Sequence, residues 1–306
     1  MTTPTARKFS PEEVAALSKK MGGGDKVKRK ANDFPQPATG RSDLVPLLPD
    51  DENNNVWTLQ GTFYLVPYLL SLSNTMTIYR DQATKELTIF NALRATPETE
   101  RRILALGKIR NVVKLGQFHG AADAYYVLSP QFESPKLWVL PGGSVADGLV
   151  TDTMTIETMT STALPVANSK LFTFDGHPFP EGFMTLPLSS TSDGKAENVL
   201  VGCDGLVHMT AADSTWSSRF LGWALGLEFT SPQVNVPKPA PLWCRNSVEA
   251  LGPGIMNHWY SELGKMSWTH YIGGHGVAAK NCDHAAIMEM CRKEIAKTKT
   301  DTADAK

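Results

Sequence analysis

Residues Asn111–Asp123 read NVVKLGQFHGAAD, and this stretch is the strongest single indication of the fold in the 306-residue chain. A short run rich in valine and leucine breaks at a glycine-containing turn that delivers His119 and then Asp123. Buried strands that end in polar loops are where sheet proteins place ligands, because the rigid strand fixes the side chain just beyond it. We therefore expect a binding or catalytic loop directly after a strand.

The same arrangement occurs twice more along the chain. Residues 198–205 read NVLVGCDG and deliver Asp204, and residues 269–276 read THYIGGHG and deliver His275. Histidine and aspartate are residue types that bind divalent metals. Three such junctions in one domain predict a shared site at one edge of a sheet.

The composition is that of an ordinary globular protein, with 42% hydrophobic residues, 20% charged residues and a formal net charge of −1. Near-neutral charge gives no global attraction to nucleic acid or to an anionic membrane. Four cysteines without CxxC spacing, and no secretory signal, favour reduced thiols and a cytoplasmic location. The most apolar stretch, residues 62–79, is interrupted by Pro67 and several polar residues, so no membrane span is expected.

The two ends of the chain are polar. Residues 1–52 are expected to form a flexible basic tail, in which Ser10 caps a short helix and the basic run at 26–30 is a candidate contact for an acidic protein partner. Residues 298–306 are expected to form a polar C-terminal tail. The folded domain is predicted to run from 53 to 297.

The elements of this domain follow from periodicity and helix signals. Alternating residues predict strands at 56–66 and 74–80, and a turn leads to a third strand in a hairpin. Thr96 caps a helix that begins at Pro97 and ends at Gly107. Strand, helix, strand, helix, strand then follows, which predicts parallel neighbours. The second half again has strands followed by helices, and a sandwich of two sheets with helices on both outer faces satisfies this order.

The chain resembles the metallo-β-lactamase-like hydrolases from residue 53 to 297. The resemblance rests on the loop after NVVKL, the CDGL turn and the GGHG turn, and more narrowly on MTIYR, KLWVLPGG and FPEG. It is similar to an uncharacterised subfamily of that fold. It implies an α/β (α+β) protein, a four-layered αββα sandwich of two mixed β-sheets flanked by helices.

The resemblance also implies a metal centre with an altered ligand set. It assigns five metal-ligand positions: His119, Asp123, His177, Asp204 and His275. The first motif of the family is HxHxDH, but this chain has Ala121 and Ala124 at the second and third histidine positions. A pair of tightly bound ions needs more ligands than remain. The expected cofactor is therefore a single divalent metal such as zinc, iron or manganese, with Glu181 as a further candidate ligand, or no metal at all.

Three functions remain open at this point. In a metal-dependent hydrolase, Asp123 acts as the general base and His275 as a ligand or charge stabiliser, and the small-molecule substrate is an ester, thioester, lactone or phosphoester. Loss of the two histidines favours instead a non-catalytic binding or scaffold subunit. A metal-free enzyme that uses its histidine and aspartate pairs directly is the third alternative.

Two residues also have simpler interpretations. Asp123 could be the N-cap of the helix that follows it. Cys203, next to Asp204, is better explained as a small buried residue than as a soft metal ligand.

Overall fold

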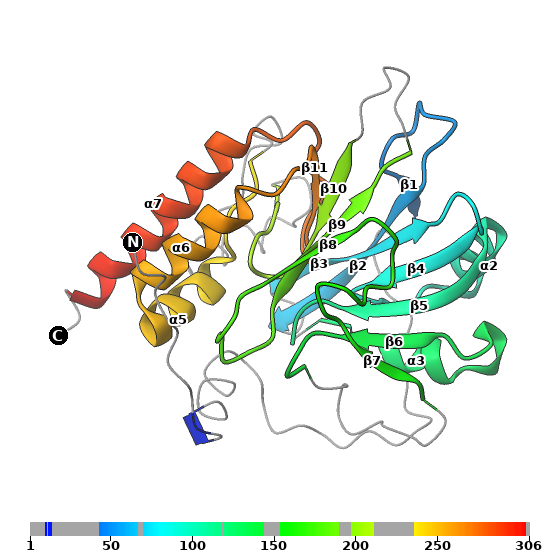
Figure 1. Ribbon diagram of the computed structural model, residues 1–306, viewed down its shortest axis with the longest axis horizontal. Coiled ribbons are helices and arrows are strands. Elements are labelled where there is room, and N and C mark those ends of the chain that lie inside the picture. Colours follow the sequence, from blue (N-terminus) through cyan, green and yellow to red (C-terminus); the bar gives the residue numbers. More distant parts are fainter. Residues whose placement is uncertain are drawn as a thin grey trace.

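Two β-sheets face each other in the computed structural model, and helices cover the outer face of each sheet (Figure 1). The structure describes residues 10, 12–13, 43–66, 70–117, 119–120, 122–143, 154–189, 197–210 and 236–303. Most of the predicted N-terminal tail, including the basic run at 26–30, lies outside these ranges. Ser10 and Glu13 form the expected capping box, in which each side chain accepts the backbone N–H of the other residue.

The first sheet has seven strands in the order β1 to β7. The first four strands pair with one another in antiparallel fashion: β1 (Leu44–Pro46), β2 (Val56–Val66), β3 (Leu70–Arg80) and β4 (Glu86–Phe90). The rest run parallel: β5 (Lys108–Lys114), β6 (Lys136–Val139) and β7 (Ile156–Thr158). The predicted hairpin and the predicted parallel strands are therefore confirmed.

Two helices follow β4 and β5 and supply the crossovers of these parallel strands. Helix α2 spans Pro97–Leu106, and the Thr96 side chain accepts the backbone N–H of Thr99 as predicted. Helix α3 spans Asp123–Leu128 and is followed by a 3₁₀ turn, η1, at Pro130–Phe132.

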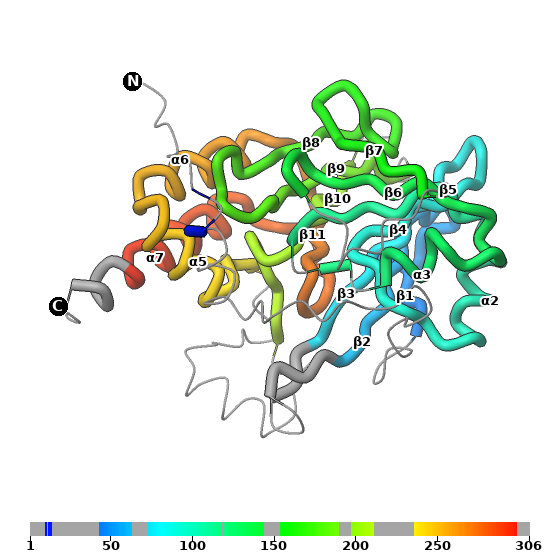
Figure 2. Tube along the Cα trace, turned by 90° about the horizontal axis from the view of Figure 1, so that it is seen from below, coloured from blue at the N-terminus to red at the C-terminus, as the bar shows by residue number. Residues whose placement is uncertain are grey.

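The second sheet has four strands in the order β11-β10-β9-β8. Its strands are β8 (Lys170–Thr173), β9 (Gly182–Pro187), β10 (Asn198–Val201) and β11 (His270–Ile272). Strands β10 and β11 are parallel, and the other pairs are antiparallel. Three helices cover this sheet: α5 (Pro241–Leu251), α6 (Pro253–Leu263) and α7 (His284–Ala303). Figures 1 and 2, drawn at right angles, both place them on the side opposite to α2 and α3.

Three clusters of buried apolar side chains pack between the two sheets and the two groups of helices. On β5, Val112 faces the helices α2 and α3, whereas its neighbour Val113 faces the second sheet. On β10, Val199 packs between the sheets and Leu200 packs under the C-terminal helices. Successive side chains of a strand point to opposite faces, so each sheet is apolar on both. The α/β/β/α sandwich predicted from the sequence is confirmed.

The ends of the folded region differ from the prediction. Strand β1 and the buried Leu47 lie within the residues assigned to the N-terminal tail, because a three-residue strand is too short to give a periodic pattern. Helix α7 continues past Lys297, and the buried Thr298 donates its hydroxyl to the carbonyl of Glu294. The C-terminal segment contains no helix breaker that would have stopped it.

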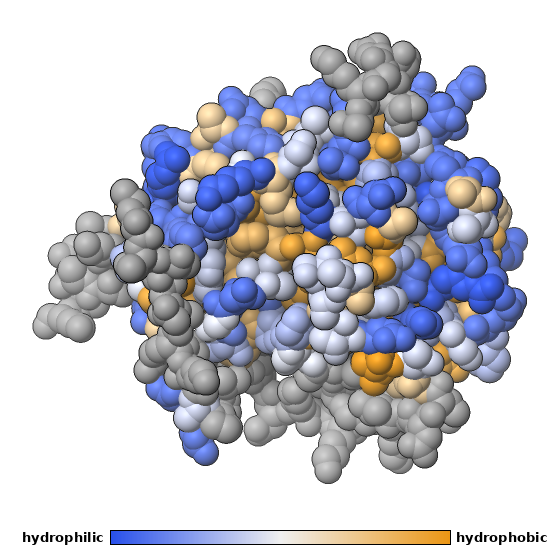
Figure 3. All heavy atoms as spheres, in the orientation of Figure 1, coloured by the Kyte–Doolittle hydropathy of each residue, from blue (hydrophilic) through white to orange (hydrophobic). Residues whose placement is uncertain are grey.

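The surface is hydrophilic over the outer parts of the face seen in Figure 3, and hydrophobic residues gather near its centre. In the part of the chain that the structure describes, no helix combines the length and the apolar character needed to cross a bilayer.

Candidate metal centre

The three loops singled out by the sequence meet at one edge of the sandwich. His119 follows β5, Asp204 follows β10 and His275 follows β11. Backbone and side-chain hydrogen bonds join the two sheets here: the Thr75 amide donates to the carbonyl of Gly274, and Asn91 Nδ2 donates to the carbonyl of Gly202. Loops from different sheets are thereby fixed next to each other.

His119, Asp204 and His275 form a tight cluster. The Nε2 atom of His119 lies 3.1 Å from Asp204 Oδ1, and the Nε2 atom of His275 lies 3.3 Å from the same oxygen. The two imidazole rings meet edge to face, with centroids 4.7 Å apart. One ligand atom from each of the three residues lies within 4.8 Å of the others.

The orientation of His275 requires a cation in this cluster. Its Nδ1 atom lies 2.8 Å from the carbonyl oxygen of Ser73, which can only accept a hydrogen bond, so Nδ1 carries a proton. In a neutral ring, Nε2 then has a lone pair that faces the Asp204 carboxylate, another acceptor. Two acceptors at this distance need a positive species between them, either a second proton on the ring or a metal ion.

A glycine makes room for the His119 ring. A Cβ atom placed on Gly274 would lie 2.6 Å from His119 Cε1, closer than real Cβ atoms approach other atoms. The first glycines of the GGHG turn therefore allow the backbone to approach the imidazole. This is a steric reason for glycine at this position.

Electrostatics favour an ionised Asp204. Burial alone would raise the pKa of this carboxyl, but the charge and hydrogen bond of His119 and the hydrogen bond of His275 hold it well below its usual range. Burial lowers the pKa of His275, but Asp204 outweighs burial and the net shift is upward. The cluster thus consists of an ionised carboxylate and two imidazoles. A positive charge on or between these groups stabilises it.

Asp123 is the first residue of α3 and is only 1% exposed. Among the described residues neither of its oxygens has a hydrogen-bond partner, so it does not act as the helix cap that the sequence allowed; the N-cap position is Ala122. Burial raises its pKa to about 7, although the Lys114 ammonium acts in the opposite direction. The Ala92 backbone also acts to lower this pKa, but burial outweighs it. A buried carboxyl with so few close donors is costly and is a frequent feature of functional sites.

His177 lies apart from this cluster. Its Nδ1 atom is 2.7 Å from the carbonyl of Phe179 and its Nε2 atom is 2.9 Å from Ser247 Oγ on α5. The ring stacks on Trp243 with an interplanar angle of 13°. Burial lowers its pKa to about 4, so the ring is neutral at pH 7. The structure brings together three of the five expected ligands, and places His177 in the packing under the C-terminal helices.

Glu181 supports the Asp204 turn. Its Oε1 atom accepts the backbone N–H of Gly205 at 2.9 Å, directly after Asp204. Burial, and then the charge of Asp204, raise its pKa well above the usual value, which favours a neutral carboxyl. Glu181 thus positions the turn after β10 in this structure.

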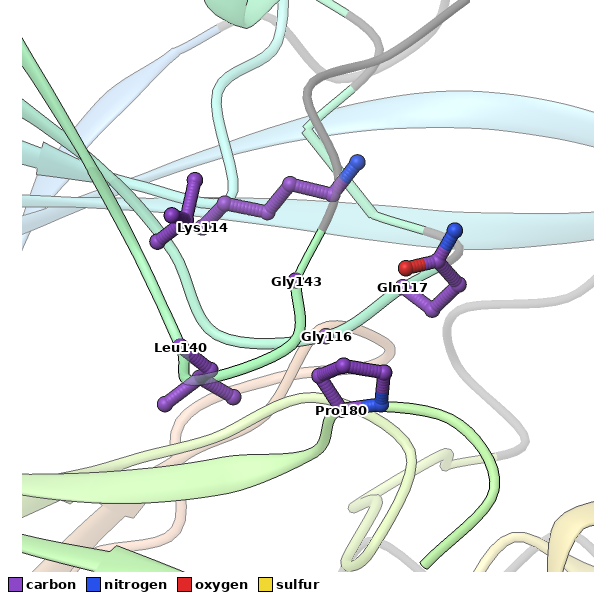
Figure 4. Close-up of a pocket in the computed structure, with 7 residues that line it drawn as sticks. Lys114, Gly116, Gln117, Leu140, Gly143 and Pro180 are labelled. Carbon is purple, nitrogen blue, oxygen red and sulfur yellow. The ribbon is translucent and has the colours of Figure 1, made fainter. Parts of the chain in front are cut away.

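Two residues that sequence reasoning missed complete the site. Asn91, in a left-handed conformation after β4, accepts the Cys203 thiol and donates to Gly202. Cys203 is fully buried, as expected for a small core residue. Lys114, at the end of β5, is also buried. A charged residue directly after the buried Val112 and Val113 was the available signal for Lys114, whose side chain is drawn in Figure 4.

The chain is similar in structure to several solved proteins. A flavo di-iron protein mutant from Thermotoga maritima superposes with a TM-score of 0.51 at 8% identity, over 84% of this chain and 63% of that one. DIM-1 metallo-β-lactamase superposes with a TM-score of 0.45 at 12% sequence identity, over 86% of this chain and 100% of that one. A β-lactamase domain protein from Burkholderia ambifaria superposes with a TM-score of 0.46 at 14% sequence identity, over 88% of this chain and 79% of that one.

The architecture agrees with the metallo-β-lactamase-like sandwich that the sequence predicts. At these identities the likeness concerns the fold alone. No protein-family model matches the chain, and no curated protein matches it in sequence.

The His119, Asp204 and His275 cluster could hold a metal ion. Tetrahedral ligands about 2.0–2.2 Å from an ion lie roughly 3.3–3.6 Å from each other. The two nitrogen–oxygen distances to Asp204, 3.1 and 3.3 Å, are close to this range. Two imidazoles and one carboxylate also leave a coordination position for water or substrate, which is typical of catalytic sites and not of structural ones.

Proposed function

We propose that this protein is a metal-dependent hydrolase with a single metal ion held by His119, Asp204 and His275. The observation that carries the proposal is the pair of acceptors at His275: its Nδ1 proton is committed to Ser73, so Nε2 and the Asp204 carboxylate face each other and need a cation between them. Zinc and iron(II) both suit two imidazoles and one carboxylate.

The residues have separate tasks in this proposal. A divalent ion at this position would supply Lewis-acid polarisation and a more acidic water. Asp204 provides the anionic ligand, and the Ser73 carbonyl fixes the His275 ring in its ligating tautomer. Asp123, with a pKa of about 7, is suited to accept a proton on one of its carboxylate oxygens near neutral pH.

The substrate proposed is a small molecule with an ester, thioester, lactone or phosphoester bond. The test uses the full chain purified without chelator, loaded with zinc, iron(II) or manganese, and assayed on one substrate of each class. We expect turnover that depends on added metal and is reduced at least a hundredfold in Asp204→Asn. Less than a tenth of an equivalent of bound metal after loading would contradict the proposal.

A non-catalytic role is the second candidate, favoured by Ala121 and Ala124 in place of histidines. In that case the fold serves to bind a protein partner, and the basic N-terminal tail is the proposed contact. Because β1 begins at Leu44, the informative deletion removes residues 1–42 and leaves the sheet intact. Loss of partner co-purification in this variant, together with neither metal uptake nor turnover in the full chain, would favour this role.

A further inference from the structure

The glycine that follows His275 is held by side chains from another part of the chain. Gly276 has a φ angle of +86°, and a Cβ atom there would lie 2.0 Å from the carbonyl oxygen of His208, so only glycine fits this position. Glycine loses more conformational freedom on folding than any other residue. Contacts from outside must therefore fix this peptide, and with it the backbone of the candidate ligand His275.

Three side chains of β2 and β3 bind the two polar groups of Gly276. The Thr75 hydroxyl and Gln60 Nε2 each donate to its carbonyl oxygen at 2.6 Å, and its N–H donates to Ser73 Oγ at 3.0 Å. A carbonyl oxygen has two lone pairs, so it can accept both donors. Gln60 and Thr75 are direct partners in the β2–β3 register, which places their side chains on the same face. We call Gln60, Ser73 and Thr75 the Gly276 clamp.

Strand β3 also holds the residue on the other side of His275. The Thr75 amide donates to the carbonyl oxygen of Gly274, and Asn74 pairs with His275 in an antiparallel bridge. Side chains alternate between the two faces of a strand, so Thr75 contacts Gly276 on one face, whereas Asn74 and its partner His275 lie on the other. The backbone on both sides of the candidate ligand is thus tied to one strand.

The imidazole depends on this arrangement because it has two partners at once. Its Nδ1 atom donates to the Ser73 carbonyl at 2.8 Å, and its Nε2 atom lies 3.3 Å from Asp204 Oδ1. The ring reaches both groups only if the His275 backbone is fixed relative to β3. Thr75 is only 1% exposed, so its hydrogen bond to Gly276 is shielded from water, where such bonds are stronger.

We propose that Thr75, with Gln60 as the second donor, is a positioning residue that sets the geometry of His275 for metal binding. It acts through the Gly276 carbonyl and does not itself touch the metal or the substrate. Groups that orient a metal ligand in this way typically change metal affinity about 10- to 100-fold when they are removed. That the orientation serves metal binding rests on the proposed function; that the clamp orients the imidazole does not.

The test compares two identical substitutions on one face of β3. Thr75→Val removes the hydroxyl and keeps the branched shape. Thr77→Val is the matched control, because Thr77 is fully buried and its hydroxyl has no hydrogen-bond partner among the described residues. Zinc titration of the full chain should show an affinity about tenfold or more below wild type for Thr75→Val and an unchanged affinity for Thr77→Val. Thr75→Ser, which restores the hydroxyl, should bind zinc within about threefold of wild type.

A second readout does not respond to stability alone. In the metal-free chain, the ring proton on His275 Nδ1 is hydrogen-bonded to the Ser73 carbonyl and should exchange slowly with water in NMR spectra. We expect slow exchange in the wild type and in Thr77→Val, and exchange about tenfold or more faster in Thr75→Val. The ring proton of His177, which lies apart from the clamp, should exchange equally in all three proteins.

Equal zinc affinities of Thr75→Val and Thr77→Val, unchanged exchange at His275, or no recovery in Thr75→Ser would overturn the proposal. If Thr75→Val does not fold, Gln60→Met takes its place, because it removes the other donor from a half-buried position. Its zinc affinity should then fall about threefold or more, and an unchanged affinity would overturn the proposal. If the wild type binds no zinc, the proposed function fails, and the exchange of the Nδ1 proton alone decides whether the clamp orients the ring.

Discussion

His275 and His177 are both partly buried loop imidazoles with one nitrogen close to a backbone carbonyl, yet their surroundings have different consequences. The second nitrogen of His177 donates to the Ser247 hydroxyl, which in turn donates to the Trp243 carbonyl, while Nδ1 accepts the Phe179 amide, so a neutral ring is satisfied in this tautomer. The second nitrogen of His275 meets the Asp204 carboxylate, which only accepts. A carboxylate partner therefore creates a cation site, whereas a hydroxyl partner completes a packed core.

The largest effect is expected from removing the charge of the Asp204 carboxylate, which contacts His275 but not His177. Asp204→Asn keeps the shape but replaces the anion with a neutral amide, so metal affinity should fall at least about a hundredfold, because the ligand set loses its only charge. His177→Gln should leave metal affinity within about twofold. Zinc titration of both variants measures this difference. Equal affinities would show that the Asp204 carboxylate is no more important for metal binding than His177.

The next largest effect is expected from filling the space that Gly274 leaves for the His119 ring. Gly274→Ala places a Cβ atom against the imidazole, so we expect a loss of about 1–3 kcal/mol in the free energy of unfolding and weaker metal binding. Gly254→Ala is the control, because its Cβ would meet nothing within 4 Å and alanine favours a helix by up to about 1 kcal/mol. Chemical denaturation of both variants tests this, and equal stabilities would contradict the close approach.

The neutral state of His177 predicts a pH dependence of stability. Its pKa is about 4 in the folded protein against 6.5 when unperturbed, so between these values the unfolded chain binds more protons. The stabilisation is complete above about pH 6.5 and is lost as the pH falls toward 4. Compared with His177→Gln, the wild type should lose about 2 kcal/mol more between pH 7 and 4.5. Parallel curves for the two proteins would show that the ring titrates normally.

The smallest effect is expected at Glu181. Its raised pKa favours a neutral carboxyl, so Glu181→Gln keeps an oxygen for the Gly205 amide and should cost less than about 1 kcal/mol. Glu181→Leu removes that acceptor and should cost about 1–3 kcal/mol. Urea denaturation separates the two. A large loss in the glutamine variant would mean that Glu181 is charged.

The sequence carried most of the fold because strand periodicity and helix caps are local signals. Thr96, Pro97 and Gly107 define α2, and apolar runs define β5, β10 and β11. Strand β1 was missed because three residues carry no pattern. The continuation of α7 depends on the burial of Thr298, which the polar composition of this segment does not indicate.

The site was predicted only where residues follow strands directly. His119, Asp204 and His275 each lie just beyond an apolar run, and the sheets bring them together. The surroundings of His177 depend on Ser247 and Trp243, which come from a distant helix. No local pattern could reveal that contact.

The most direct test of the central claim is X-ray absorption spectroscopy of the full chain loaded with zinc. We expect one ion per chain, a nitrogen and oxygen shell at about 2.0–2.2 Å, and outer-shell scattering from two imidazoles with no sulfur. Failure to retain zinc, a sulfur shell from a cysteine, or a site without imidazole would contradict it.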